Sequence, residues 1–239
     1  NGAYAETMGR KLQKNQPHAN LKAMGPNELQ RKSGPPMQTR DGRWVKTGPA
    51  VMAGPADSYV GYGEAWANVS NTPFREYKHW VHEGGISTPL IVHWPKGIPG
   101  SRAGKLEAQP AHLIDIMATC LDVSGAEYPK EFNGETIKPV EGVSLKPAFQ
   151  GKSLSRKNPL YWEHESNRAI RDGKWKLVAM EDSPWELYDM EKDRTEMNNL
   201  ASQHPEKVRE LSAAWEAWAR RADVLPLGAW KPVAKTKGK

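Results

Sequence analysis

Residues 74–95, FREYKHWVHEGGISTPLIVHWP, place a charged segment, a glycine turn and an apolar run in direct succession. Lys78 lies among histidines and aromatic residues, and the Glu-Gly-Gly at 83–85 allows the backbone to turn sharply. The run at 88–94, TPLIVHW, is continuously apolar and has the length of a strand, which favours a strand buried on both faces. The stretch therefore predicts an interior strand that is entered through a tight turn.

A helix is predicted after this strand. Pro110 suits its first turn, and Gly125 suits the position just after its last turn. Its apolar stripe consists of Leu113, Ile114, Met117 and Leu121. Cys120, the only cysteine, falls on this helix, so we expect a buried thiol. A single cysteine excludes an intrachain disulfide and a CxxC metal site. Residues 142–152 predict one further helical turn at most.

Three short strands are predicted next, at 167–173, 174–180 and 185–190. Asp172-Gly173 separates the first two and is a strong hairpin signal. In the middle strand apolar residues alternate with Lys174 and Lys176, which predicts an antiparallel strand buried on one face only. A C-terminal helix begins at Pro205, and its apolar face consists of Val208, Leu211, Trp215, Trp218 and Ala222.

The two ends of the chain carry its excess of positive charge. The formal net charge is +6, and residues 1–50 alone hold nine Lys or Arg against three Asp or Glu. These ends show no nucleic-acid-binding motif, so solvated loops are the preferred interpretation and no nucleic-acid partner is expected. Residues 1–56 contain frequent Gly-Pro breakers and few apolar runs, which predicts a loop-rich, poorly ordered segment. Residues 226–239 are expected to form a loose basic tail.

The bulk sequence bears on three questions: whether the chain spans a membrane, whether it is a fragment, and whether its tryptophans bind sugars. No run of about 18 apolar residues is present, so no membrane span is expected. The chain starts at Asn1 without a signal-peptide pattern, which suggests a fragment or a processed chain. Ten tryptophans could stack on sugars, but Trp175, Trp215 and Trp218 fall on apolar stripes and are expected to lie in the core.

Five blocks of the sequence resemble the formylglycine-dependent sulfatases of arylsulfatase type. They are WANVSNTPFREYKHWVHEGGISTPLIVHWPKGI, HLIDIMATCLDVSGAEYP, GVSLKPAF, YWEHESNRAIRDGKWKLVA and WELYDMEKDRTEMNNLA, in the order of the family. Together they cover most of residues 57–222. The resemblance implies an α/β fold: the end of an alkaline-phosphatase-like catalytic domain at 57–125, and a small α+β subdomain with an antiparallel sheet and a C-terminal helix at 126–225. Residues 1–56 would then be a remnant of the catalytic domain.

The resemblance also implies a sulfuric ester hydrolase acting on a small-molecule or glycan sulfate ester. In that family a Cys or Ser in a Cys/Ser-x-Pro/Ala-x-Arg motif becomes formylglycine, and three aspartates with one asparagine hold a divalent cation, usually calcium. No Cys or Ser of this chain has that motif: Cys120 is followed by Asp122 and Ser124 at the two offsets. We therefore expect the chain as given to be inactive. The family suggests a periplasmic or secreted protein.

Three residues are candidates for the site. Lys78 precedes Glu83 by five residues, where the family places a lysine that contacts the sulfate; a solvated lysine is the plain alternative. Asn1 matches the asparagine of the metal motif, and its side-chain carbonyl suits a hard cation. His164 lies in a predicted loop near the mouth of the family's cleft and is a candidate substrate contact.

The remaining histidines give no such signal. His79 and His82 have no third metal ligand nearby in the sequence, so structural or surface roles are expected. His112 precedes a helix and is expected to cap it or pack beside it. Two other functions stay open: a phosphoester or phosphonate hydrolase of the same superfamily, and a non-catalytic glycan-binding module built on the tryptophans and the hairpin.

Overall fold

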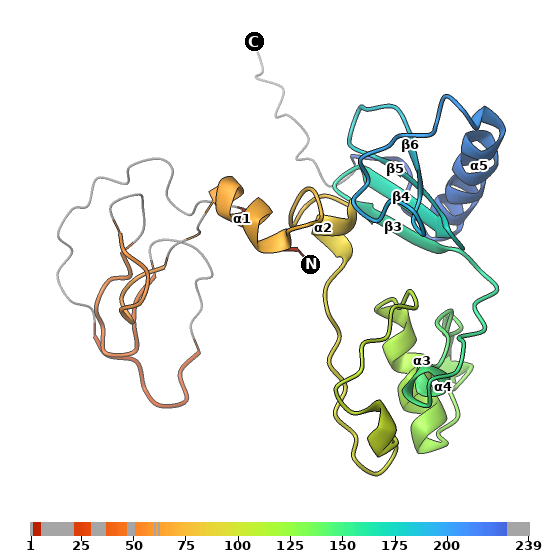
Figure 1. The fold of residues 1–239 in the computed structure, drawn as a ribbon. Helices are drawn as coiled ribbons and strands as arrows, with labels where there is room; N and C mark the ends of the chain where they lie inside the picture. The colour runs from red at the N-terminus through yellow and green to blue at the C-terminus, as the bar shows by residue number, and fades with distance from the viewer. Residues whose placement is uncertain are drawn as a thin grey trace.

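The computed structural model describes residues 2–5, 22–29, 37–46, 51–59, 61 and 63–228. Its largest regular unit is a four-stranded antiparallel sheet of β3 (Leu160–His164), β4 (Asn167–Asp172), β5 (Trp175–Ala179) and β6 (Glu186–Asp189), in that spatial order. Helix α5 (Pro205–Arg221) covers one face of this sheet (Figure 1). The predicted antiparallel sheet with a C-terminal helix is therefore confirmed.

The predicted hairpin is confirmed with a shift of one residue. Asp172 pairs with Trp175, so the two loop residues are Gly173 and Lys174. Gly173 has φ +54, a value that glycine adopts without steric cost. Strand β3 (Leu160–His164) was not predicted, and His164 was expected in a loop before the hairpin. It exists because its backbone pairs along its whole length with β4.

The core lies between the sheet and α5. Leu211, Trp215 and Ala219 of the helix meet Ile170, Leu177 and Leu187 of the three strands β4 to β6. Trp175 and Trp218 pack at the edge of this cluster, so the prediction that these tryptophans with Trp215 serve the core is confirmed. Burying each large apolar side chain contributes about 1.5–3 kcal/mol, which makes this cluster the main source of stability for the sheet.

The prediction that β5 is buried on one face only is wrong. Lys176 is fully buried, as are Leu177 and Val178 on opposite faces of the strand. The second face of the sheet is covered by the segment that ends in α2 (Glu83–Ile86), through Val81 and Ile86. Successive side chains of β5 do alternate between the two faces of the sheet. The side chain of Lys176, however, contacts buried carboxylates instead of solvent.

The predicted interior strand at 88–94 is also wrong. These residues have no regular secondary structure, and Leu90, Ile91 and Val92 are exposed. A strand requires hydrogen-bonding neighbours, and no described strand pairs with this segment. At the end of the run, Trp94 packs edge-on against Phe149, with 6.5 Å between ring centres.

The helix predicted from Pro110 begins later, as α3 (Ile114–Ser124). The carboxylate of Asp115 accepts a hydrogen bond from the amide of His112 at 2.8 Å, which holds a turn ahead of the helix. Gly125 ends α3 with φ 70, as predicted. The expected buried stripe is wrong: Leu113 is exposed, and so is the thiol-bearing Cys120.

The buried side of α3 is polar instead. Asp115 is fully buried and accepts the amide of Val143 at 2.9 Å and the guanidinium of Arg156 at 2.5 Å. The short helix α4 (Lys146–Phe149), a single turn as predicted, packs on α3. His112 stacks edge-on against Trp162 at 5.2 Å between ring centres, which confirms its predicted packing role. Burial lowers the pKa of the His112 imidazole.

The other described elements are short. They are α1 (Gly63–Asn71), the 3-10 turn η1 (Gly100–Arg102), and the small hairpin β1 (Glu131–Phe132) and β2 (Glu135–Thr136). Gln38 forms an isolated bridge with Trp44, and Lys46 another with Ser58.

Much of the predicted segment 1–56 and most of the tail 226–239 lie outside the described residues. The domain boundaries at residues 56, 125 and 225 stay predictions. Within the described ranges, no helix is long and apolar enough to cross a membrane.

Candidate functional site

The turn after Lys78 is held by close backbone contacts. Gly84 donates its amide hydrogen to the carbonyl of Arg75 at 3.0 Å, and a Cβ on Gly84 would overlap the carbonyl oxygens of Arg75 and Glu76. A Cβ on Gly85 would overlap the carbonyl oxygen of Trp80 in the same way. Neither glycine has a positive φ. The sequence requires glycine here because the backbone segments touch, not because the turn is left-handed.

The N-terminal residues lie against this turn. Gly2 donates its amide hydrogen to Gly85 at 2.9 Å, and Lys78 donates its amide hydrogen to the carbonyl of Ala3 at 3.0 Å. The ammonium of Lys78 lies 4.8 Å from the ring centre of Tyr4. Asn1, the candidate metal ligand, is outside the described residues. Its sequence neighbour Gly2 is thus placed directly beside the turn that carries Lys78.

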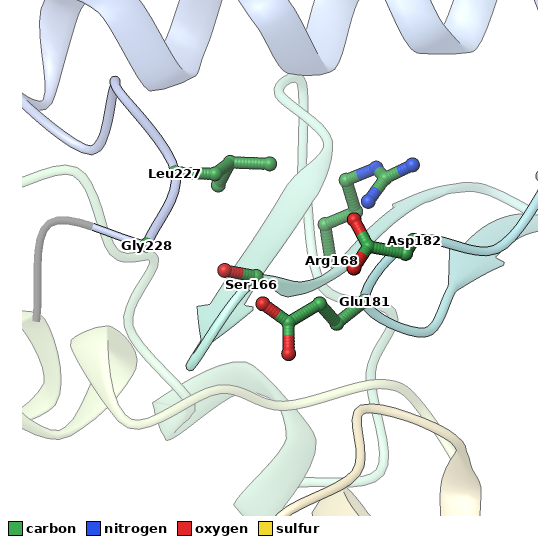
Figure 2. A pocket seen from close by; sticks show the side chains of 6 residues that line it. All are labelled: Ser166, Arg168, Glu181, Asp182, Leu227 and Gly228. Carbon is green, nitrogen blue, oxygen red and sulfur yellow. The ribbon is translucent and has the colours of Figure 1, made fainter. Parts of the chain in front are cut away.

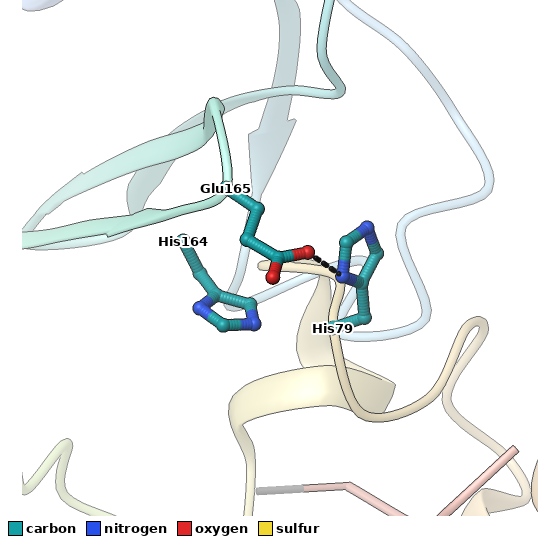
Figure 3. A group of neighbouring side chains, drawn as sticks. All are labelled: His79, His164 and Glu165. Carbon is teal, nitrogen blue, oxygen red and sulfur yellow. Dashed lines mark ion pairs between the residues drawn. The ribbon is translucent and has the colours of Figure 1, made fainter. Parts of the chain in front are cut away.

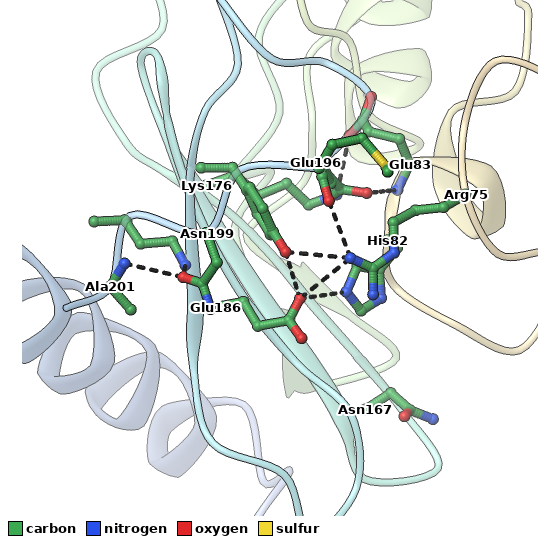
Figure 4. Close-up of polar contacts among 12 residues, drawn as sticks. Arg75, His82, Glu83, Asn167, Lys176, Glu186, Glu196, Asn199 and Ala201 are labelled. Atoms are coloured by element: carbon green, nitrogen blue, oxygen red, sulfur yellow. Dashed lines mark hydrogen bonds and ion pairs between the residues drawn. The ribbon is translucent and has the colours of Figure 1, made fainter. Parts of the chain in front are cut away.

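One polar network ties this turn to β6 (Figure 4). Glu186 accepts a hydrogen bond from the phenol of Tyr188 at 2.7 Å and contacts the ring of the fully buried His82 at 3.1 Å. The hydrogen bond from His82, followed by that from Tyr188, lowers the pKa of Glu186 to about 2 although partial burial opposes the shift. Arg75 adds a contact to Tyr188 at 3.3 Å. Burial and the Glu186 carboxylate raise the pKa of Tyr188.

A second network lies deeper, under α2 (Figure 4). The ammonium of Lys176 contacts Glu83 at 3.0 Å and Glu196 at 2.7 Å, and all three side chains are buried. Glu196 also accepts the amide hydrogen of Glu83 at 2.7 Å. Burial alone would raise the pKa of the Glu83 carboxyl, but the charge and hydrogen bond of Lys176 outweigh it and lower this pKa. The two networks fix the Lys78 turn on the sheet.

Two histidines and a glutamate meet beside Lys78 (Figure 3). His164 ends β3 and is exposed, Glu165 follows it, and the ring of His79 lies 5.5 Å from that of His164. Nδ1 of His79 lies 2.9 Å from the Glu165 carboxylate. The sequence analysis missed this group because His79 and His164 lie in different elements. Among the described residues, it is the group of His, Cys, Asp and Glu side chains able to hold a metal ion.

A separate cavity of about 260 Å³ opens near the end of the described chain (Figure 2). Ser166, Arg168, Glu181, Asp182, Leu227 and Gly228 line it. None of the predicted site residues contributes to its wall. The guanidinium of Arg168 stacks over the ring of Trp185 at 4.7 Å and donates to the carbonyl of Ser183, so its charge serves the local packing.

Known proteins match this chain in sequence and in fold. The family profile described as N-sulphoglucosamine sulphohydrolase, C-terminal, matches residues 75–217. An uncharacterized sulfatase of Schizosaccharomyces pombe is 29% identical over 176 residues, covering 71% of this chain and 31% of that protein. An arylsulfatase of Klebsiella aerogenes is 36% identical over 104 residues, covering 43% of this chain and 22% of that protein.

Further relatives agree. The N-acetylgalactosamine-6-sulfatase of Canis lupus familiaris is 30% identical over 107 residues, covering 45% of this chain and 19% of its own length. The crystal structure of Ps i-CgsB superposes with a TM-score of 0.52 at 24% identity, covering 69% of this chain and 39% of that one, and shows a common fold. The chain therefore belongs to the sulfatase family, in the part described by the N-sulphoglucosamine sulphohydrolase C-terminal profile.

The extent of the match bears on the chemistry. The chain spans about a third or less of the length of these curated relatives. Family membership implies a metal ion and a formylglycine in a complete sulfatase. Among the described residues, the group of His, Cys, Asp and Glu side chains that could hold a metal is imidazole-rich and suits a transition metal better than calcium.

Proposed function

We propose that the complete protein hydrolyses sulfate esters and that Lys78 is the residue of this chain that contacts the sulfate. The observation that carries the proposal is the pair of backbone hydrogen bonds that join Gly2 to Gly85 and Ala3 to Lys78. They hold Gly2 and Ala3, which follow the proposed ligand Asn1 in the sequence, against the turn that carries the lysine. The segment that follows the metal motif in the sequence therefore lies beside the residue that the resemblance assigns to sulfate.

The proposed role of Lys78 is electrostatic. A sulfate ester is anionic, and the oxygen of the departing alcohol gains negative charge as the sulfur–oxygen bond breaks. An ammonium held in place stabilises that charge without reorganising during the reaction. The glycine turn and the two buried networks hold the Lys78 backbone, so the side chain starts from a fixed position.

The proposed cofactor is calcium, with Asn1 as one ligand. A side-chain carbonyl oxygen suits a hard cation, and calcium takes six to eight such oxygens, so Asn1 alone cannot hold it. In the complete protein a formylglycine would supply the attacking oxygen. Since no residue of this chain has the precursor motif, we propose that the 239-residue chain alone is inactive.

The proposed substrate is a small-molecule or glycan sulfate ester, with His164 as a contact. His164 is exposed at the end of β3, and its ring lies 5.5 Å from that of His79, the neighbour of Lys78. A substrate held at Lys78 would thus extend toward His164. Ps i-CgsB has also been solved in complex with k-i-k-neocarrahexaose, which supports a glycan for a protein of this fold.

Release of inorganic sulfate by the complete protein tests the proposal. The protein should liberate sulfate from a generic aryl sulfate in the presence of calcium, with phosphate and phosphonate esters of the same alcohol as comparisons. Preferential turnover of the phosphorus esters would favour the alternative hydrolase. Binding of a sulfated glycan with no turnover of any ester by the complete protein would favour the binding module.

A further inference from the structure

We propose that His79, His164 and Glu165 form a binding site for Zn²⁺, separate from the proposed calcium site. The three side chains come from two segments: His79 lies in the turn that follows Lys78, whereas His164 ends β3 and Glu165 begins the connection to β4 (Figure 3). Each offers one ligand atom, and the three atoms lie within 4.8 Å of one another. The proposal does not depend on sulfate ester hydrolysis, but it shares His164 with the proposed substrate contact, so zinc and substrate would compete for that side chain.

The distances suit a shared ion after a small side-chain movement. Two imidazoles bound to one tetrahedral zinc at about 2.0–2.1 Å have ring centres about 5 Å apart. The rings of His79 and His164 are 5.5 Å apart and steeply inclined, at 74°. The carboxylate of Glu165 is already 2.9 Å from Nδ1 of His79. The exposed side chain of His164 has the rotational freedom to complete the set.

The contacts around His79 leave its Nδ1 atom facing the Glu165 carboxylate. The amide of Asn167 lies 3.4 Å from Nε2 of His79, so Nδ1 is the nitrogen that faces Glu165. Asn167 is buried and also donates to the backbone carbonyl of His164 at 2.9 Å. One buried amide therefore contacts both halves of the proposed site and aligns the two loops.

The backbone around the site is unusual as well. His79 has φ 101 although it is not glycine, whereas Glu165 (φ 50) and Ser166 (φ 72) form the two-residue turn between β3 and β4, a turn that needs positive φ at both positions. The value at His79 has no such explanation: residues other than glycine rarely adopt it, and it persists only where the surrounding structure imposes it. An exposed ion pair between His79 and Glu165 contributes little to stability and does not by itself account for the backbone of His79.

The donor atoms select the class of metal. Two imidazoles and one carboxylate are the ligands of zinc sites that keep a fourth position open. Imidazole also suits other transition metals, whereas calcium prefers oxygen ligands alone. His79 and Glu165 are each about one-third exposed, so an ion can reach the site. Bound zinc would link the turn that follows Lys78 to the connection between β3 and β4. These two segments are far apart in the sequence.

Zinc titration of the untagged 239-residue chain tests the proposal. Cys120 should first be replaced by serine, because the exposed thiol could bind zinc by itself. Calorimetry should then show one zinc ion per chain, and zinc should raise the melting temperature because an ion that binds only the folded state stabilises it. Calcium at the same concentration should not give a binding signal that depends on His79, His164 or Glu165.

Matched variants identify the ligands. His79→Ala, His164→Ala and Glu165→Gln should each abolish saturable binding and the rise in melting temperature. His204→Ala is the control: His204 also faces a glutamate, Glu206 at 3.7 Å, but has no third ligand among the described residues. The His204→Ala variant should bind zinc normally. No saturable binding, or its retention in any of the three ligand variants, overturns the proposal. Glu165→Gln keeps the test decisive if a histidine variant misfolds.

Discussion

The ammonium of Lys176 lies 2.7 Å from the carboxylate of Glu196, and both side chains are completely buried. This ion pair connects the middle of β5 to the loop that follows β6. Through Glu83, which contacts both partners, it also holds α2 on the sheet. The segment that carries Lys78 is thus fixed to the C-terminal subdomain by charge as well as by apolar contacts.

Replacing Lys176 by methionine should destabilise the fold strongly. The change leaves the carboxylates of Glu83 and Glu196 buried without their shared cation, and breaking a buried pair in this way costs about 3–5 kcal/mol. Urea unfolding followed by circular dichroism measures the loss. Lys174→Met is the matched control, because Lys174 pairs with Asp189 at 3.0 Å but is partly exposed, and we expect it to cost about 0–1 kcal/mol. Equal losses in both variants would contradict the buried-network interpretation.

Glu186 should make stability depend on acid pH. Its pKa is about 2 in the folded protein against 4.5 ordinarily, mainly because of the hydrogen bond from His82. A carboxyl with a lowered pKa stabilises the fold fully above its unfolded pKa, and this contribution disappears as the pH falls from about 4.5 to about 2. Unfolding free energies between pH 6 and pH 2 should therefore fall less steeply in Glu186→Gln than in the parent chain.

The exposed Glu131→Gln serves as the control for that series. Glu131 lies on the small hairpin and is exposed, so its replacement should leave the slope between pH 4.5 and 2 unchanged. A parent chain and a Glu186→Gln variant with identical slopes would show that this carboxyl is not held in its charged form by His82 and Tyr188.

Gly84→Ala should perturb the turn. The added methyl group would overlap the carbonyl oxygens of Arg75 and Glu76, and backbone atoms cannot move aside cheaply. Overpacking of this kind costs about 1–3 kcal/mol. Gly100→Ala is the matched control, because a Cβ there meets nothing within 4 Å, and the change should stay within about 0.5 kcal/mol. Thermal unfolding of both variants compares them directly; a neutral Gly84→Ala would mean that the backbone contact is looser than described.

Lys78→Ala in the complete protein should lose kcat by about 100- to 1,000-fold, the usual effect of removing one fixed electrostatic contact to a transition state. Its melting temperature should stay within a few degrees, because the Lys78 side chain is partly exposed. Lys78→Arg should restore little activity, since a planar guanidinium does not replace a compact ammonium.

Lys96→Ala is the control for the lysine series. Lys96 follows the apolar segment 88–94 in an exposed loop, so kcat for aryl sulfate should not change. Near-normal kcat in Lys78→Ala, or a general loss of folding, would remove Lys78 from the proposed catalytic residues.

The sequence by itself determined the elements whose signals are local. The Asp-Gly at 172–173 predicted the hairpin to within one residue, because the turn geometry depends on the loop residues alone. The apolar spacing from Val208 to Ala222 predicted α5, because a helix that packs on one side repeats its apolar residues every three or four positions. The blocks around Lys78 and Asp172 also predicted the sulfatase family, which the comparisons confirm.

Only the tertiary structure decided which side chains meet and which surfaces are covered. The alternation in β5 made Lys176 look solvent-facing, because the sequence does not show that Glu83 and Glu196 lie above it. The run 88–94 looked like an interior strand, but a strand forms only where another chain segment supplies its hydrogen bonds. His79 and His164 became neighbours for the same reason: contacts between distant segments depend on packing, which no local pattern records.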